Sequence, residues 1–260
     1  RESIFGALAE RHTFAVTGDR IEAEFGLASE IPGDVIDPDG GAHGFLNVHG
    51  RDAIDAVDIL KNGRTWRRFS PNGSETEARE YPRLIRLEWG WDGLGSQYVT
   101  RWEIEAKLVD GEIGGVEPGF TSGPSTVELT PEIQLSGKDR VRLVSWSTRA
   151  NDRPTQQVLL RTNAESESVL QLDVTCVREG KSASKRLNVP LKVLEKDDFH
   201  VGMADEFTFP RLKVHAIAEA TQVNAAFEWQ DRAAAPCDFY ILQVRQQNGH
   251  LAWTSPIWCK

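Results

Sequence analysis

Cysteine is scarce in this sequence: Cys176, Cys237 and Cys259 are the three cysteines among 260 residues. So low and odd a number excludes a disulfide framework, and without a C-x-x-C pair a structural zinc site is disfavoured. Cys176 falls on the apolar side of a predicted strand, which favours an inert core thiol over a nucleophile. Cys237 and Cys259 lie near opposite ends of the last predicted hairpin, where a disulfide would require distortion.

Long apolar runs and an excess of positive charge are also lacking. No apolar stretch approaches the roughly 18 to 20 residues that span a bilayer, and there is no signal peptide. Acidic side chains number 39 against 30 basic ones, which gives a net charge of −9. Because nucleic-acid affinity comes largely from neutralising phosphates, this composition argues against a nucleic-acid partner.

Familiar catalytic motifs are lacking as well. There is no G-x-S-x-G elbow, no H-x-H or H-E-x-x-H metal motif and no glycine-rich phosphate loop before a helix. One loop does gather oxygen and imidazole ligands, and its opening resembles that of a calcium loop. No glutamate follows at the twelfth position, so a solvated loop is favoured over a weak metal site or a cryptic catalytic site. The residues concerned are Asp34, Asp37, Asp39, His43 and His49.

What is present is mainly period-two alternation of apolar and polar residues, which predicts half-buried strands. The clearest runs cover residues 21–27, 98–108 and 170–176. Asn62-Gly63 and Asp110-Gly111 are hairpin signals, and Glu179-Gly180 closes a strand. Pro190 cannot donate a ladder hydrogen bond, so the strand predicted over 187–193 belongs at a sheet edge.

The last hairpin can be assigned a register if Asn248-Gly249 is a two-residue turn. Val244 then faces Trp253, Leu242 faces Ser255 and Tyr240 faces Ile257. This register places one set of side chains on the core-facing side of the hairpin: Tyr240, Leu242, Val244, Leu251, Trp253 and Ile257.

The fold predicted is mostly β, an antiparallel β-sandwich with one short N-terminal helix. The helix covers residues 3–11, with Ile4, Phe5 and Leu8 on one face. Residues 1–20 form the helix and a turn, and residues 21–260 form the sandwich. A turn-rich stretch at 130–137 offers a division into two β modules.

Tryptophan is the compositional oddity, with eight residues against three tyrosines. Trp89 and Trp91 could present two flat indoles for stacking on a sugar, the alternative being that both lie in the core. Among the scattered histidines, His215 falls on the polar side of its strand and is expected at the surface.

Two stretches resemble a known family: residues 1–21 (RESIFGALAERHTFAVTGDRI) and 238–258 (DFYILQVRQQNGHLAWTSPIW). They are similar to the C-terminal region of carbaryl-hydrolase-like metallohydrolases, which are built on the PHP (polymerase and histidinol phosphatase) barrel. The departures are mild, since Phe14 and Val16 stand where Tyr and Thr are common. Residues 64–137 show no resemblance to this family or to any other.

The resemblance implies that the catalytic centre lies outside this chain. The metal-binding His and Asp residues of that family belong to a barrel that would precede Arg1, so no catalytic residue is carried over. The chain begins without methionine, as a processed form or the later part of a longer polypeptide would. The candidates for contact with the barrel are Ile4, Phe5, Leu8, Thr17, Gly18, Asp19 and Arg20. For the last four, a simple strand connection is the alternative.

The function expected is therefore a non-catalytic accessory β domain that braces or covers the barrel of a metal-dependent hydrolase. The divalent metal would be held by the barrel, with no cofactor in this chain. The alternative is a stand-alone carbohydrate-binding β-sandwich module that uses Trp89 and Trp91. The sequence gives no indication of cellular compartment.

Overall fold

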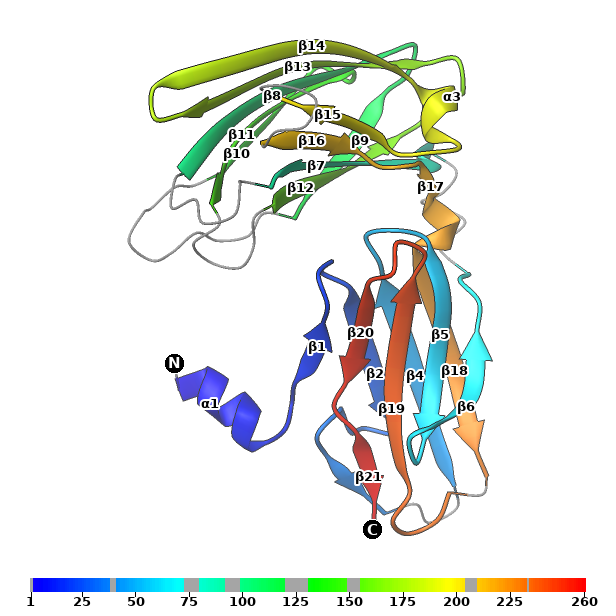
Figure 1. Cartoon of the computed structure of the whole chain (residues 1–260). Coiled ribbons are helices and arrows are strands. Elements are labelled where there is room, and N and C mark those ends of the chain that lie inside the picture. Colours follow the sequence, from blue (N-terminus) through cyan, green and yellow to red (C-terminus); the bar gives the residue numbers. More distant parts are fainter. Residues whose placement is uncertain are drawn as a thin grey trace. The chain divides into compact units, whose positions relative to one another are not determined.

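The chain folds into two compact units, shown by a computed structural model (Figure 1). The structure describes residues 2–37, 41–72, 80–91, 99–119, 131–148, 155–203, 210–232 and 234–260. Unit 1 comprises residues 1–78 and 219–260, and unit 2 comprises residues 79–218. Unit 2 is thus inserted into the sequence of unit 1. The division near 130–137 is wrong, because that stretch lies inside unit 2.

Unit 1 contains helix α1 (Glu2–Ala9) and two sheets, with a short 3-10 helix, η2 (Ala220–Gln222). The larger sheet has seven strands: β1 (Phe14–Val16), β20 (Leu251–Thr254), β19 (Phe239–Gln246), β21 (Ile257–Cys259), β3 (Val35–Ile36), β5 (Ile54–Lys61) and β6 (Arg64–Phe69). The smaller sheet has the order β18 (Asn224–Asp231), β4 (Ala42–His49) and β2 (Glu22–Leu27). The pairings are antiparallel except for β21 with β3.

The core of unit 1 lies between its two sheets. Phe25 of β2 stacks on Trp229 of β18, with ring centroids 5.6 Å apart, and Tyr240 of β19 meets Trp229 at 5.2 Å. Glu22 and Glu24, which alternate with the inward residues of β2, are exposed. Phe25 and Leu27 of β2 are buried, as the period-two pattern predicted.

Unit 2 is a second pair of sheets. One has the order β10 (Glu132–Ser136), β11 (Arg140–Thr148), β8 (Val99–Val109), β13 (Val169–Arg178) and β14 (Lys181–Pro190), and α3 (Leu191–Leu194) follows β14. The other has the order β15 (Phe199–Gly202), β16 (Arg211–Val214), β7 (Arg83–Gly90), β12 (Thr155–Thr162) and β9 (Ile113–Pro118), with β17 (Ala218–Glu219) beside β7. The mostly β, antiparallel sandwich fold is therefore confirmed.

Two indoles lie in the hydrophobic core of unit 2. Trp89 and Trp102 are both fully buried, and each indole N–H donates to a serine hydroxyl of β11. The distances are 2.9 Å from Trp89 to Ser145 and 2.8 Å from Trp102 to Ser147. These bonds satisfy the polar edge of each ring inside an apolar core.

Two-residue hairpin turns are found at Asn62-Gly63, where a hairpin was predicted, and at Glu179-Gly180, where the sequence predicted the end of a strand. Asn62-Gly63 joins β5 to β6 and Glu179-Gly180 joins β13 to β14, and all four residues have positive φ. Asp110-Gly111 is not a hairpin turn, because β8 and the following β9 belong to different sheets. Asp110 also has a positive φ of 60°, so the chain does turn here as predicted. The turn leads into a strand of the other sheet instead of forming a hairpin.

The final hairpin has a different turn from the one predicted. The Gln246 N–H donates to the His250 carbonyl at 2.9 Å, so three residues form the loop, and Gly249 takes the left-handed conformation with φ 87°. Val244 therefore faces Ala252 rather than Trp253.

This one-residue change reverses the faces of β20. Ala252 and Thr254 are buried, whereas Leu251 and Trp253 are only half-buried. Between β19 and β21 the pairing is the predicted one, because Tyr240 faces Ile257. A shift of one residue moves every side chain of a strand to the opposite face.

The edge position predicted from Pro190 is confirmed, because β14 is the last strand of its sheet. The strand ends at Pro190, however, and Val193 lies in α3 rather than in an extended strand. Among the described residues, none of the helices combines the length and the apolar character needed to cross a membrane.

Candidate functional site

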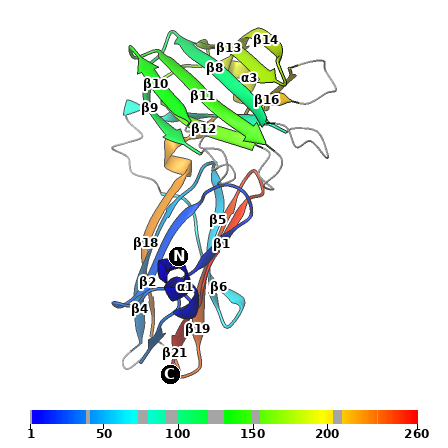
Figure 2. The same ribbon diagram turned by 90° about the vertical axis from the view of Figure 1, so that its left-hand side faces the viewer.

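Helix α1 presents a bare apolar face. Ile4, Phe5 and Leu8 have exposed fractions of 64, 70 and 58%, and none of the eight residues of α1 is buried. Figure 2 views unit 1 from this side, with α1 in front of the strands. We call Ile4, Phe5 and Leu8 the α1 face. An isolated helix of this length is marginal in water, so the α1 face is a candidate for contact with a partner.

The end of α1 is nevertheless fixed to unit 1. Arg11 donates from Nε and Nη2 to the carbonyl of Gly33, at 3.2 and 3.0 Å. Its guanidinium carbon also lies 5.5 Å from the ring centroid of Trp258, a cation–π contact. Gly33, with φ 111°, allows this close approach because a Cβ there would meet the His12 side chain and the backbone of Glu10 and Arg11, which follow α1.

A second contact joins the same two segments. His12 Nε2 lies 3.0 Å from Asp34 Oδ1, and the Ile31 N–H donates to Asp34 Oδ2 at 3.0 Å. The backbone donor of Ile31 and the imidazole of His12 hold the pKa of Asp34 below its ordinary value. Arg11, His12, Gly33 and Asp34 together form what we call the α1 clamp.

More exposed apolar side chains come from the segments that the α1 clamp connects. They are Phe14, Ile31 and Val35, with exposed fractions of 57, 47 and 46%. Large apolar side chains exposed in one region are typical of an interaction surface.

The predicted turn at residues 17–20 is bound to the final hairpin. Thr17 exchanges hydrogen bonds with the backbone of Leu251, its N–H donating at 3.0 Å and its Oγ1 accepting at 2.9 Å. Asp19 is buried, and its Oδ2 accepts from Gln246 and Asn248 at 2.7 Å each.

Burial of Asp19 corrects its candidacy as a barrel contact, because its carboxylate is enclosed by its own chain. The strand-connection alternative accounts for it. Thr17, Gly18 and Arg20 are exposed, so contact with a partner remains a prediction for these three residues.

The two tryptophans predicted to stack on a ligand do not form a platform. Trp89 is fully buried, and its indole N–H is taken by Ser145, so this prediction is wrong. Trp91 follows β7 with a φ of 55° and is half-buried. A single partly exposed indole lacks the coplanar partner that the proposal required.

The loop with candidate metal ligands is also corrected in part. His43 and His49 lie on β4, and Asp34 belongs to the α1 clamp, while Asp39 lies outside the described residues. Across the described part of the chain, no group of three or more His, Cys, Asp or Glu side chains could hold a metal ion.

The three cysteines are free thiols. Cys176 is buried on β13, as predicted. Cys237 is exposed and Cys259 is buried, and the Cys237 N–H donates to the Cys259 carbonyl at 3.0 Å. Burial raises the pKa of the Cys259 thiol, and the nearby Asp238 carboxylate adds to this effect.

His215 lies in a buried polar network, whereas the sequence predicted that this imidazole is at the surface. His215 is 5% exposed; its Nδ1 lies 2.7 Å from Arg86 Nη2 and its Nε2 lies 2.7 Å from Glu88 Oε2. Arginine can only donate, so Nδ1 accepts and Nε2–H donates to Glu88. Burial lowers the pKa of His215 against the opposing effect of Glu88. The neutral imidazole is thus hydrogen-bonded through both of its ring nitrogens.

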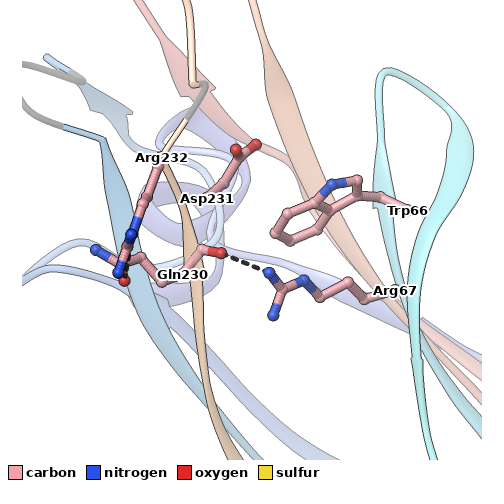
Figure 3. A pocket seen from close by; sticks show the side chains of 5 residues that line it. All are labelled: Trp66, Arg67, Gln230, Asp231 and Arg232. Atoms are coloured by element: carbon pink, nitrogen blue, oxygen red, sulfur yellow. Dashed lines mark hydrogen bonds between the residues drawn. The ribbon is translucent and has the colours of Figure 1, made fainter.

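A pocket of about 540 Å³ lies in unit 1 (Figure 3). It is lined by Trp66, Arg67, Gln230, Asp231 and Arg232. The first two come from β6 and the next two from β18, with Arg232 directly following. None of these residues was singled out from the sequence, because their positions on two distant strands give no local motif.

Charged side chains behind the pocket form a connected group. Lys61 Nζ lies 2.7 Å from Asp231 Oδ2 and 2.9 Å from Asp238 Oδ2, and the Tyr240 hydroxyl donates to Asp231 at 2.9 Å. Burial alone would lower the pKa of Lys61, but the two carboxylates outweigh it and raise the pKa. Burial and Asp231 raise the pKa of Tyr240 strongly. The lysine and tyrosine therefore keep their protons.

No protein-family model matches the sequence, and no curated protein matches it either. Function therefore has to be inferred from the side chains themselves.

Proposed function

We propose that this chain is a non-catalytic accessory β domain that docks through the α1 face onto a catalytic barrel. The observation that supports the proposal is a helix with no buried residue, held at one end by the α1 clamp. A fixed end orients the helix, while its apolar face lacks cover among the described residues. This combination suits a docking element whose partner completes the packing.

The energetics of such docking are favourable. Full burial of a large apolar side chain contributes about 1.5–3 kcal/mol, so the α1 face could supply several kcal/mol. A barrel in the same polypeptide would be present at an effective concentration in the millimolar range, so a modest interface suffices.

The reaction would then belong to the partner. Following the sequence resemblance, the barrel is that of a PHP-type metal-dependent hydrolase, in which a divalent metal activates water. This chain would brace or cover that barrel. The carbohydrate-binding alternative built on Trp89 and Trp91 loses its basis, because Trp89 is buried.

The docking can be tested with a separately expressed PHP barrel of a carbaryl-hydrolase-like protein. We expect calorimetry to show binding to this chain, and Phe5→Asp with Leu8→Asp to weaken it at least tenfold by placing charges in the interface. Leu135→Asp is the matched control, since Leu135 is 48% exposed on β10 of unit 2.

Two results would contradict the proposal. One is equal binding by the wild-type chain and the α1 variant. The other is hydrolysis of ester or phosphodiester substrates by this chain alone, with a metal requirement that the α1 variant leaves unchanged.

A further inference from the structure

The pocket of unit 1 lies between β6 of the larger sheet and β18 of the smaller sheet, and we call this border between the two sheets the seam. Among the described strands, β6 pairs only with β5 and β18 only with β4, so both are edge strands of their respective sheets. Arg67 bridges this seam by donating from Nη2 to the Gln230 carbonyl at 2.9 Å, as Figure 3 shows. Figure 1 shows β6 and β18 on the side of unit 1 that lies away from α1.

An aromatic wall supports one side of this pocket. Trp66 is half-buried and meets Trp229 and Tyr240 edge to face, with centroids 5.8 and 6.0 Å away. Both partners are fully packed core residues, so the indole of Trp66 is held in place. Figure 3 shows this indole extending toward Asp231 across the pocket. A rigid indole binds apolar C–H surface at little cost in side-chain entropy.

Two arginines supply positive charge at the rim. The guanidinium of Arg67 lies 4.4 Å from the Trp66 centroid, and Arg232 Nε donates to Gln230 Oε1 at 3.5 Å. Both arginines are exposed, and within the described ranges neither forms an ion pair. Each guanidinium therefore retains N–H groups that can donate hydrogen bonds to the oxygens of a carboxylate.

The acidic residue of the pocket does not cancel this charge. Asp231 is bound by Lys61 and by the hydroxyl of Tyr240, and Lys61 is shared with Asp238. Together with Arg67 and Arg232, this group carries three cations and two anions. The pocket therefore favours a ligand with negative charge.

We propose that this pocket binds a carboxylated sugar, a uronic-acid residue. The arginines would bind its carboxylate, the pocket-facing part of the Trp66 indole would contact the C–H face of the ring, and the Gln230 amide would bind a hydroxyl. A sugar ring can use the Trp66 indole as well as the arginines of this pocket, whereas a phosphate ion has no apolar surface to place against the indole. This site is independent of docking through α1.

The test is a titration of the whole chain with glucuronate, followed by the indole N–H resonance of Trp66 in NMR spectra. That resonance is identified by its loss in Trp66→Phe. We expect a saturable shift with glucuronate and at least tenfold weaker binding of glucose, which lacks the carboxylate.

Arg67→Gln and Arg232→Gln should each weaken glucuronate binding by roughly tenfold, the value of one charge-assisted hydrogen bond. Arg64→Gln is the matched control, because Arg64 is an exposed residue of β6 outside the pocket lining and should leave the affinity unchanged. Thermal unfolding of each variant confirms that it folds.

Three outcomes would overturn the proposal. One is binding of glucose as tight as that of glucuronate, and another is displacement of glucuronate by inorganic phosphate at equal concentration. The third is glucuronate affinity that is unchanged in the Arg67→Gln, Arg232→Gln double variant.

Discussion

The side-chain amide of Gln246 donates a 2.7 Å hydrogen bond to the buried carboxylate of Asp19, across 227 positions of sequence. The same glutamine accepts through Oε1 from the backbone N–H groups of Arg51 and Asp52, at 2.7 and 3.3 Å. One buried side chain thus joins the turn after β1, the final hairpin and the segment before β5. This contact joins the two parts of the unit 1 sequence, which are separated by unit 2.

Replacing Asp19 tests the importance of this contact. Asp19→Ala leaves the amides of Gln246 and Asn248 without their acceptor, and we expect unit 1 to lose about 1–3 kcal/mol of its free energy of unfolding. Hydrogen exchange at the amides of β19 measures this loss. Arg20→Ala, at the exposed neighbour, should change the stability by less than about 0.5 kcal/mol. Equal effects of the two variants would show that the carboxylate does not hold the turn.

The burial of Trp89 predicts a different response in unit 2. Trp89→Ala removes a fully buried indole and leaves the Ser145 hydroxyl without its donor, so we expect a loss of about 3–5 kcal/mol. Chemical denaturation followed by circular dichroism measures it. Trp91→Ala, at the half-buried neighbour, should cost far less. A mild effect of Trp89→Ala would contradict the core position of this ring.

The unpacked state of α1 has a consequence for its dynamics. Because no residue of α1 is buried, its amides should exchange with solvent at an opening free energy below about 1 kcal/mol in the isolated chain. Amides of β19 serve as the internal reference, since this strand is paired on both sides. Binding of a barrel should slow exchange in α1. Protection of α1 equal to that of β19 without a partner would show that the helix needs no docking.

The buried His215 makes unit 2 sensitive to acid. Its pKa lies below the ordinary value of 6.5, so as the pH falls through that value the unfolded state takes up a proton that the folded state does not. The free energy of unfolding must then decrease with falling pH, by at most about 1.4 kcal/mol per pH unit for one proton. Glu88, whose pKa is also lowered, acts in the same direction at lower pH.

Denaturation of the wild type and of His215→Gln at several pH values between about 7.5 and 5 measures this effect. We expect a smaller slope in His215→Gln, whereas His200→Gln, at an exposed histidine of β15, should retain the wild-type slope. An unchanged slope in His215→Gln would mean that this imidazole does not titrate differently in the two states.

The strands of this protein could be predicted because their signal is local. In β8, alternate residues from Thr100 to Leu108 are buried, and the sequence shows that alternation directly. Asn62-Gly63 could be assigned for a similar reason, since asparagine and glycine both tolerate the positive φ that the turn requires. The Asn248-Gly249 prediction was wrong because two-residue and three-residue loops both accept glycine in the left-handed conformation.

The candidate sites were predictable only where one segment carries the whole feature. The α1 face is such a case, because Ile4, Phe5 and Leu8 share one helix and their exposure follows from the absence of a local partner. The pocket is the opposite case: Trp66 and Arg232 are far apart in the sequence and meet only because β6 and β18 flank one seam.

The sequence by itself determined the β character of the chain, the N-terminal helix and most strand faces, because side-chain periodicity and turn chemistry act over a few residues. Only the tertiary structure decided that unit 2 interrupts unit 1, that Trp89 and His215 are buried, and which side chains line the pocket. These properties depend on which sheets face each other. Pairing between distant strands is set by the packing of the whole core, and no short stretch of sequence encodes it.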